Sequence, residues 1–302
     1  MQTRKIPNTD LEVSVVCVGT MLFGTPVNER GATAIVSEAF NGGVNFFDTA
    51  NMYEGYTRFV GSTGGLSEEY LGKAIVSCRH KSVIATKVGM AIGPNAKDRG
   101  LSRDHVKREC DRSLIRLQTD YTDIYYLHSY DELTPIEESI ETMIDLIAAG
   151  KVRFWGISNF NCEQTMAVLA ACDRNGWTRP VVHQPQYSLV NRCIEEDLVP
   201  LCRKEEISIV PYRILESGLL CGKYDEGIPK GSRADDNPSW IPQLENKETI
   251  QEVAVLNSAA RDAGRTLYEH VLLETANKPG IASILLGIKR PEQIKDACQI
   301  LN

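Results

Sequence analysis

The sequence predicts an α/β protein whose eight parallel strands and accompanying helices close into a (β/α)8 barrel, the TIM-barrel architecture. Three observations support this prediction. Short apolar runs alternate with longer segments of helical apolar spacing along nearly the whole chain, a pattern typical of strands joined by helical crossovers. The apolar runs number eight. The chain has 302 residues without a composition break that marks a linker, so we expect a single domain over residues 1–302.

Each predicted strand is a short apolar run bounded by polar or glycine-containing segments. In chain order the predicted strands are 15–18, 44–47, 83–86, 123–127, 153–157, 181–184, 208–210 and 282–286. Because strand and helix alternate, right-handed crossovers would make the sheet parallel.

Helix boundaries are marked by capping residues and glycines. Ser67, Ser102, Thr134-Pro135 and Asn161 stand at the starts of segments with helical spacing, and such residues are favoured at helix N-termini. Glycines at 42–43, 150 and 176 follow three helical segments and predict their ends. The longest irregular stretch, 224–247, follows the seventh strand, and we expect a functional lid or a mobile segment there.

Composition excludes several classes of protein. Acidic residues number 40 and basic residues 33, giving a net charge of −7 without a dense cluster of Lys and Arg, so we expect no nucleic-acid partner. No apolar stretch approaches the roughly 20 residues that span a membrane, and the N-terminus lacks the apolar core of an export signal. Nine cysteines without a C-x-x-C pair argue against disulfides and zinc and favour a cytoplasmic protein.

Familiar nucleotide and hydrolase motifs are absent. The sequence contains neither G-x-G-x-x-G nor G-x-x-x-x-G-K-[ST], so a bound nucleotide would be held in another way. The run 156–160 begins like a nucleophile elbow, but Phe160 replaces the glycine that the sharp turn needs. The five histidines show no metal-binding spacing, and we expect no metal site.

Four polar residues follow three consecutive predicted strands. Asp48 ends the run VNFF, Tyr53 comes five residues later, Lys87 ends SVIATK, and His128 ends DIYYLH. The ends of neighbouring strands converge at the carboxyl mouth of a barrel, so we expect these four side chains to meet there.

Together these residues suit proton delivery to a carbonyl that is being reduced. We expect Lys87 to lower the pKa of the Tyr53 phenol, Asp48 to hold Lys87, and His128 to hydrogen-bond the carbonyl oxygen. Each residue alone also has a structural interpretation: a strand-end Asp can cap a helix, and a lone His is often part of a core. Their joint placement at successive strand ends favours catalysis.

At this point the chain resembles the aldo-keto reductase superfamily, in the branch that includes potassium-channel beta-subunit-like proteins and bacterial reductases. The resemblance covers essentially the whole chain. It rests on VGTMLFG (18–24), GGVNFFDTANMYE (42–54), SEEYLGKAI (67–75), GLSRDHV (100–106), RSLIRLQTDYTDIYYLH (112–128), TPIEESIETMIDLIAAGKVRFWGISNF (134–160) and SGLLCGKY (217–224).

The resemblance implies NADP(H)-dependent reduction of an aldehyde, ketone or keto-sugar, or the reverse oxidation. It implies Tyr53 as general acid/base, with Asp48, Lys87 and His128 as its catalytic partners. The implied cofactor-binding residues are Thr20, Met21, Asp48, Ser158, Asn159, Gln184, Tyr212, Arg213, Leu215, Gly218, Lys223, Gly287, Lys289, Arg290 and Gln293. Within this set, Ser158, Asn159 and Gln184 match residues that hold the carboxamide, and Tyr212 matches the aromatic that stacks on the nicotinamide.

The segment 212–223 resembles the family's diphosphate-binding loop, and 287–297 resembles the segment around the adenosine end. This outer part of the implied cofactor site is less strictly matched. Lys289 and Arg290 are suited to a 2'-phosphate, but ordinary solvated surface charge is the alternative, and NAD(H) is not excluded. Arg213 and Ile214 stand where many relatives have Ser-Pro, and Ala297 stands where the family often has an Asn that contacts adenine.

Two further alternatives concern function. Some relatives are accessory subunits of channels, so a nucleotide-binding regulatory subunit with slow turnover is the alternative to an enzyme. An enzyme could also act on a specialised metabolite such as an NDP-sugar. Met21, Ser129 and Tyr130 follow strand ends and are candidates to line the substrate opening, or else they pack at its rim. The glycine-rich stretch 55–65 has a phosphate-binding alternative, although no helix start follows it directly. We expect a small-molecule partner; the oligomeric state stays open.

Overall fold

The computed structural model describes residues 1–59, 61–224, 227–230 and 232–302. Its main sheet has eight parallel strands in the spatial order β10-β3-β4-β5-β6-β7-β8-β9. Every predicted strand is present, with ends that differ by at most two residues from the prediction. The strands are β3 Val16–Gly19, β4 Phe46–Asp48, β5 Val83–Val88, β6 Thr122–Leu127, β7 Val152–Ser158, β8 Val182–Gln184, β9 Ser208–Ile209 and β10 Ile284–Gly287.

The first and last strands of this order meet and close the sheet. The backbone N–H of Ile209, in β9, donates to the oxygen of Gly280 at 2.9 Å, and the N–H of Ala282 donates to the oxygen of Ile209 at 2.9 Å. Farther along, the N–H of Leu285 in β10 donates to the oxygen of Pro211 at 3.1 Å. The prediction of a (β/α)8 barrel is therefore confirmed.

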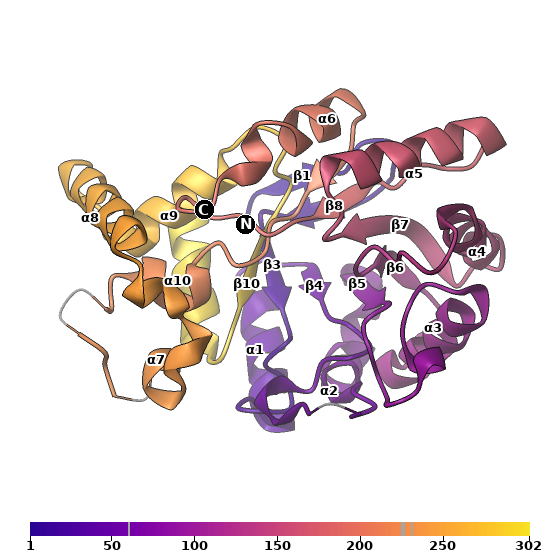
Figure 1. The fold of residues 1–302 in the computed structure, drawn as a ribbon. Coiled ribbons are helices and arrows are strands. Elements are labelled where there is room, and N and C mark those ends of the chain that lie inside the picture. The colour runs from indigo at the N-terminus through magenta and orange to yellow at the C-terminus, as the bar shows by residue number, and fades with distance from the viewer. Residues whose placement is uncertain (60, 225–226, 231) are drawn as a thin grey trace.

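Helices surround the outside of the sheet (Figure 1). The helices of the described residues are α1 Glu29–Asn41, α2 Leu66–Ile75, α3 Arg103–Leu117, α4 Ile136–Ala148, α5 Cys162–Asn175, α6 Leu198–Lys204, α7 Arg233–Asp236, α8 Lys247–Asp262, α9 Leu267–Ala276 and α10 Pro291–Leu301, of which α7 and α8 belong to the segment after β9. Asn161 caps α5 as predicted, because its side chain accepts from the N–H of Gln164 at 2.8 Å. Across the described residues, no helix combines the length and apolar composition that a bilayer-spanning segment needs.

The predicted start of a helix at Ser67 is wrong in its detail. Helix α2 begins one residue earlier, and Gly65 occupies the N-cap position. The Ser67 hydroxyl is buried instead and hydrogen-bonds Thr20 at 2.8 Å and Thr49 at 3.0 Å. Ser67 therefore ties α2 to the ends of β3 and β4 and does not cap the helix.

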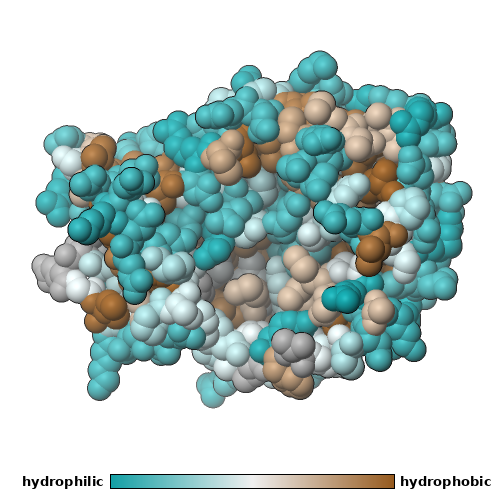
Figure 2. Space-filling view, viewed as in Figure 1, coloured by the Kyte–Doolittle hydropathy of each residue, from teal (hydrophilic) through white to brown (hydrophobic). Residues whose placement is uncertain are grey.

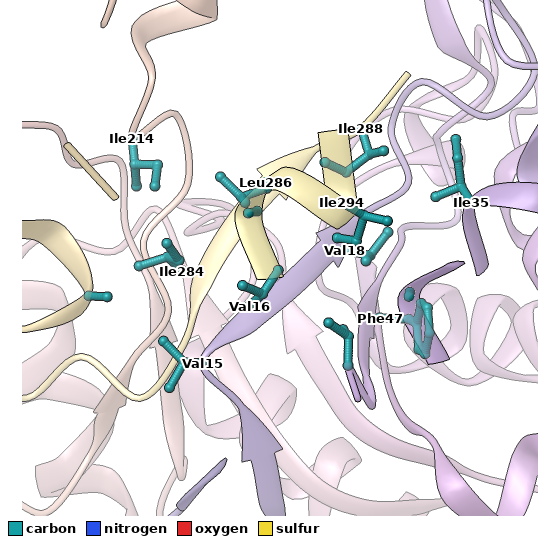
Figure 3. Packing of buried hydrophobic residues seen from close by; sticks show 14 of the residues in the cluster. Val15, Val16, Val18, Ile35, Phe47, Ile214, Ile284, Leu286, Ile288 and Ile294 are labelled. Carbon is teal, nitrogen blue, oxygen red and sulfur yellow. The ribbon is translucent and has the colours of Figure 1, made fainter. Parts of the chain in front are cut away.

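Successive residues of each strand divide between two layers. In β3, Val16 and Val18 pack among residues of the surrounding helices, whereas Cys17 belongs to the cluster inside the barrel. Figure 3 shows the outer layer where Val16 and Val18 lie near Leu286 of β10 and Ile294 of α10. This alternation of period two is what a parallel strand with helices on its outer face requires.

A hairpin that the sequence analysis did not predict covers one end of the barrel. Strands β1 Thr3–Lys5 and β2 Glu12–Ser14 pair in antiparallel register. The hairpin side chains Ile6, Leu11 and Val13 are buried in the same cluster as the strand residues that face the barrel interior. Because β2 leads directly into β3, the hairpin closes the amino end, and the carboxyl end stays free for a site.

The long stretch after β9 contains more regular structure than predicted. The short helices α7, Pro238–Trp240 and Pro242–Glu245 interrupt it. Residues 225–226 and 231 of the predicted lid lie outside the described residues. Since β9 is the seventh strand of the barrel, this stretch lies on the carboxyl side, as expected.

Candidate active site

The four predicted catalytic residues come together at the carboxyl ends of the strands. Asp48 is the last residue of β4, Lys87 lies in neighbouring β5, and His128 follows β6 directly. Tyr53 lies in the loop after β4, and its ring is edge-on to that of His128, with centroids 5.9 Å apart and an interplanar angle of 80°. Figure 2 shows a mostly hydrophilic face of the molecule with a hollow near its centre.

A buried ion pair lies at the base of the site. The Lys87 ammonium donates to Oδ1 of Asp48, to the backbone oxygen of Thr49 at 2.9 Å and to Oη of Tyr53 at 3.4 Å. Both charged side chains are almost completely buried. The second carboxylate oxygen of Asp48 accepts from Nε2 of Gln184 at 2.8 Å. All three ammonium protons of Lys87 are therefore used, as a buried lysine requires.

Lys87 stays charged in this setting. Burial alone would lower its pKa, but the neighbouring Asp48 and Tyr53 outweigh burial and raise the pKa above the ordinary value for lysine. His128 is neutral, because burial and the Lys87 charge hold its pKa well below its usual range. A neutral imidazole can donate a hydrogen bond without adding a second positive charge.

The expectation of a low pKa for Tyr53 is not met. Burial raises the pKa of Tyr53 above its ordinary value; Lys87 acts in the opposite direction, and Asp48 offsets part of that effect. The prediction from the sequence considered the effect of the Lys87 ammonium on the Tyr53 pKa but not that of the Asp48 carboxylate, which pairs with Lys87. The phenol is therefore fully protonated at neutral pH.

The residues predicted to hold a carboxamide form a connected hydrogen-bond network. Ser158 donates to the backbone oxygen of Gln184 at 2.8 Å, and Nδ2 of Asn159 donates to the backbone oxygen of His128 at 2.8 Å. The hydroxyl of Tyr212 donates to Oδ1 of Asn159 at 2.7 Å. The structure thus brings the predicted ring-stacking aromatic to the same end of the barrel as His128.

The predicted diphosphate-binding segment after β9 has an unusual backbone. Arg213, Glu216 and Ser217 have positive φ angles of 60°, 43° and 58°, and Gly218 follows at 102°. Non-glycine residues rarely adopt this conformation, and such residues cluster at functional sites. A Cβ on Gly218 would lie 2.8 Å from Nζ of Lys223, so the lysine ammonium lies directly over this turn.

Sequence reasoning missed Glu216. Glu216 is 2% exposed, and its carboxylate accepts from Oγ of Ser188 at 2.8 Å and Nε2 of Gln243 at 3.4 Å. Glu216 thereby joins the turn at 213–218 to the loop after β8 and to the long stretch after β9. An acidic residue inside an otherwise apolar and glycine-containing run was the available signal.

The remaining predicted cofactor residues come from the end of β3, from this turn and from the end of β10. The Thr20 hydroxyl faces inward and donates to the Asp48 backbone oxygen at 3.0 Å, whereas Met21 is 46% exposed. Leu215 accepts from the N–H of Gly218 at 2.8 Å within the turn. Gly287 ends β10, where an added methyl would meet no atom within 4 Å.

The predicted adenosine end lies at the start of α10. The side-chain oxygen of Gln293 accepts from the backbone N–H groups of Lys289 and Arg290 at 2.8 and 3.1 Å, so Gln293 fixes this turn. The Lys289 ammonium lies 5.2 Å from the centroid of the Tyr56 ring, which packs against Trp240 at 4.6 Å. The contact of Lys289 with the loop after β4 was not predicted.

The three candidates for the substrate opening have different surroundings. Tyr130 packs edge-on against buried Phe160, with ring centroids 5.4 Å apart, which favours rim packing for this residue. Met21 is exposed after β3 and has the freedom to contact a ligand. Ser129, next to His128, is partly exposed.

The closed barrel of eight parallel strands is the fold of a class of oxidoreductases. Residues 15–302 match the model of the aldo/keto reductase family, and the chain belongs to that family.

Three relatives show the breadth of that family. A probable voltage-gated potassium channel subunit beta from Arabidopsis thaliana is 33% identical over 98% of this chain and 90% of its own length. L-glyceraldehyde 3-phosphate reductase from Escherichia coli is 30% identical over 100% of this chain and 88% of its own length. Protein tas from Escherichia coli is 32% identical over 100% of this chain and 93% of its own length.

Replacing Lys87 with Met should leave Asp48 buried without a cation. We expect the free energy of unfolding to fall by about 3–5 kcal/mol, the cost of leaving one partner of a buried pair alone. Adding Asp48→Asn should recover a large part of that loss, because the amide needs no counter-charge. Urea unfolding of the wild type, both single variants and the double variant gives the coupling energy.

The control for this cycle is the exposed pair of Lys73 and Glu29, at 2.7 Å and about half exposed on both sides. At this exposed pair, Lys73→Met should lower the free energy of unfolding by less than about 1 kcal/mol. Additive losses for Lys87 and Asp48 would contradict the pairing.

Proposed function

We propose that this protein reduces a small-molecule carbonyl to an alcohol with NADP(H), and catalyses the reverse oxidation, with Tyr53 as general acid/base. The observation that carries this proposal is the Lys87 ammonium, which contacts the Asp48 carboxylate and lies 3.4 Å from the Tyr53 hydroxyl beside the neutral His128. Membership in the aldo/keto reductase family supports the same chemistry.

In this proposal a bound nicotinamide supplies or accepts the hydride at the substrate carbon. His128 donates a hydrogen bond to the carbonyl oxygen, and Tyr53 transfers its phenolic proton to that oxygen as the double bond becomes single. Lys87 then stabilises the phenolate that remains, since its charge lies 3.4 Å away. In the reverse direction the phenolate accepts the proton from the alcohol.

The surrounding donors fit a nicotinamide dinucleotide. Asn159 Oδ1 accepts one hydrogen bond from Tyr212 and has capacity for a second, from a carboxamide. The Tyr212 ring would stack on the nicotinamide and fix which face is presented. Arg213 and Lys223 would bind the diphosphate at the turn with left-handed backbone, where Arg213 is exposed and donates to Ser217 at 3.3 Å.

The proposed substrate is a carbonyl compound: an aldehyde, a ketone or a keto-sugar. The accessory-subunit alternative is not favoured, because among the described residues the exposed large apolar side chains lie on several elements, for example Ile115 on α3, Met166 on α5 and Val255 on α8. All nine cysteines are free thiols, which supports the proposed cytoplasmic location.

Changing Tyr53 to Phe removes the proton donor and keeps the ring. We expect the single-turnover rate of hydride transfer from NADPH to an aldehyde to fall at least about 100-fold, since a positioned acid contributes about 10²–10⁴. The dissociation constant for NADPH should change little. Stopped-flow absorbance at the nicotinamide band measures the rate, and protein fluorescence quenching measures binding.

Tyr130→Phe is the matched control, because this ring lies after the same strand as His128 and packs on Phe160. Its rate should stay close to that of the wild type. Wild-type rates in the Tyr53→Phe protein would refute the assigned role.

The preference for NADPH over NADH is assigned to Lys289 and Arg290. Changing both to Met should weaken NADPH binding by about 10- to 100-fold, the usual worth of hydrogen bonds to a charged phosphate, and leave NADH binding unchanged. Fluorescence titration with both nucleotides checks this. Lys295→Met, an exposed lysine on helix α10, which follows Lys289 and Arg290, is the control. Equal affinity of the wild type for NADPH and NADH would overturn the assignment.

A further inference from the structure

The loop that follows Tyr53 is in close backbone contact with the loop after β3 on one side. A Cβ on Gly55 would lie 1.9 Å from the backbone oxygen of Thr25, so only glycine fits at this position. The N–H of Tyr56 donates to that same oxygen at 2.8 Å. The loop after β4 thus packs on the loop after β3.

On the other side the loop is held by one arginine. Nη1 of Arg58 donates to the backbone oxygen of Met52 at 2.6 Å, and Nη2 donates to the backbone oxygen of Ala91 in the loop after β5. The Glu54 carboxylate lies 3.9 Å from Nη1, and the Arg58 side chain is 21% exposed. A planar guanidinium can donate to two carbonyls at once, which an ammonium point charge does less well.

The hydrogen bond from Arg58 to the backbone oxygen of Met52 fixes the peptide unit that joins Met52 to Tyr53. In this peptide the oxygen of Met52 accepts from Arg58, and the N–H of Tyr53 donates to the oxygen of Ala50 at 3.0 Å. Because a peptide unit is planar, two opposed hydrogen bonds set its orientation. That orientation determines where the Tyr53 side chain leaves the backbone, and its hydroxyl reaches Lys87 at only 3.4 Å.

We propose that Arg58 is the positioning residue for Tyr53: it fastens the 52–53 peptide to the loop after β5 and so keeps the phenol within reach of Lys87. This inference rests on the proposed function of Tyr53. It also gives Gly55, Tyr56 and Arg58 of the glycine-rich stretch a structural role. Nη1 and Nη2 of Arg58 donate to backbone oxygens, and the proposal gives Arg58 no contact with the substrate.

Three variants test the proposal. Arg58→Ala should lower the single-turnover rate of hydride transfer from NADPH to 4-nitrobenzaldehyde by at least tenfold and leave the NADPH dissociation constant within twofold. Guanidinium ion added to Arg58→Ala should restore part of the rate. Arg58→Lys should give a rate between those of the wild type and Arg58→Ala, because lysine keeps the positive charge but cannot donate to both carbonyls with the geometry of a guanidinium. This variant tests the proposal even where Arg58→Ala folds poorly. Arg174→Ala is the control, since Arg174 is 62% exposed and pairs with Glu137 on the outer helices.

A second measurement needs no substrate. In protein containing 3-fluorotyrosine, the ¹⁹F resonance of Tyr53, identified by its loss in Tyr53→Phe, should shift or broaden in Arg58→Ala and stay unchanged in Arg174→Ala. A wild-type rate in Arg58→Lys together with an unaltered Tyr53 resonance in Arg58→Ala overturns the positioning role. Absence of hydride transfer in the wild type overturns the proposed function instead, and the fluorine spectrum still decides whether Arg58 orients Tyr53.

Discussion

The candidate site depends on one buried ion pair, between Lys87 and Asp48. Placing two charges in the interior of a barrel costs several kcal/mol for each ion unless their hydrogen bonds are complete. Here they are complete: the ammonium has three acceptors, and each carboxylate oxygen has a donor. The Tyr53 hydroxyl is one of these three acceptors. The ion pair of Lys87 and Asp48 therefore also holds the Tyr53 phenol in place.

The barrel makes this arrangement geometrically possible. Asp48 and Lys87 come from adjacent strands, since β4 and β5 pair in parallel register. Gln184 reaches Asp48 from β8, which is separated from β4 by three strands in the sheet. Only a closed sheet brings these strand ends close enough to share one hydrogen-bond network. The hairpin β1–β2 closes the opposite end, so the polar groups gather at the carboxyl mouth.

Local patterns in the sequence were enough to predict the strands and the four strand-end residues. The apolar runs have the length of buried strands, and a polar residue at the end of such a run stands out. The hairpin was missed because its strands have three residues each, too short for a periodic signal. The pKa of Tyr53 was misjudged because burial, and the carboxylate already paired with Lys87, depend on tertiary structure.

The contacts made by Arg58 and Glu216 could not be predicted for a similar reason. Each joins loops that follow different strands, and only coordinates show which backbone oxygen or hydroxyl a long side chain meets. Lys289 was predicted as a phosphate ligand because its segment resembles the adenosine end of the family's cofactor site and because its side chain is cationic. Its contact with the ring of Tyr56 depends on how two distant loops pack.

Tyr53 keeps its proton at neutral pH although Lys87 lies beside it, and the proposed chemistry depends on this protonation state. Protein labelled with ¹³C at the ζ carbon of tyrosine, titrated by NMR and compared with the Tyr53→Phe variant to assign the resonance, measures this directly. We predict that Tyr53 ionises above pH 10, since burial raises its pKa from the ordinary value of 10.0. Ionisation below about pH 8 would show that the ammonium outweighs burial, and would contradict this description of the site.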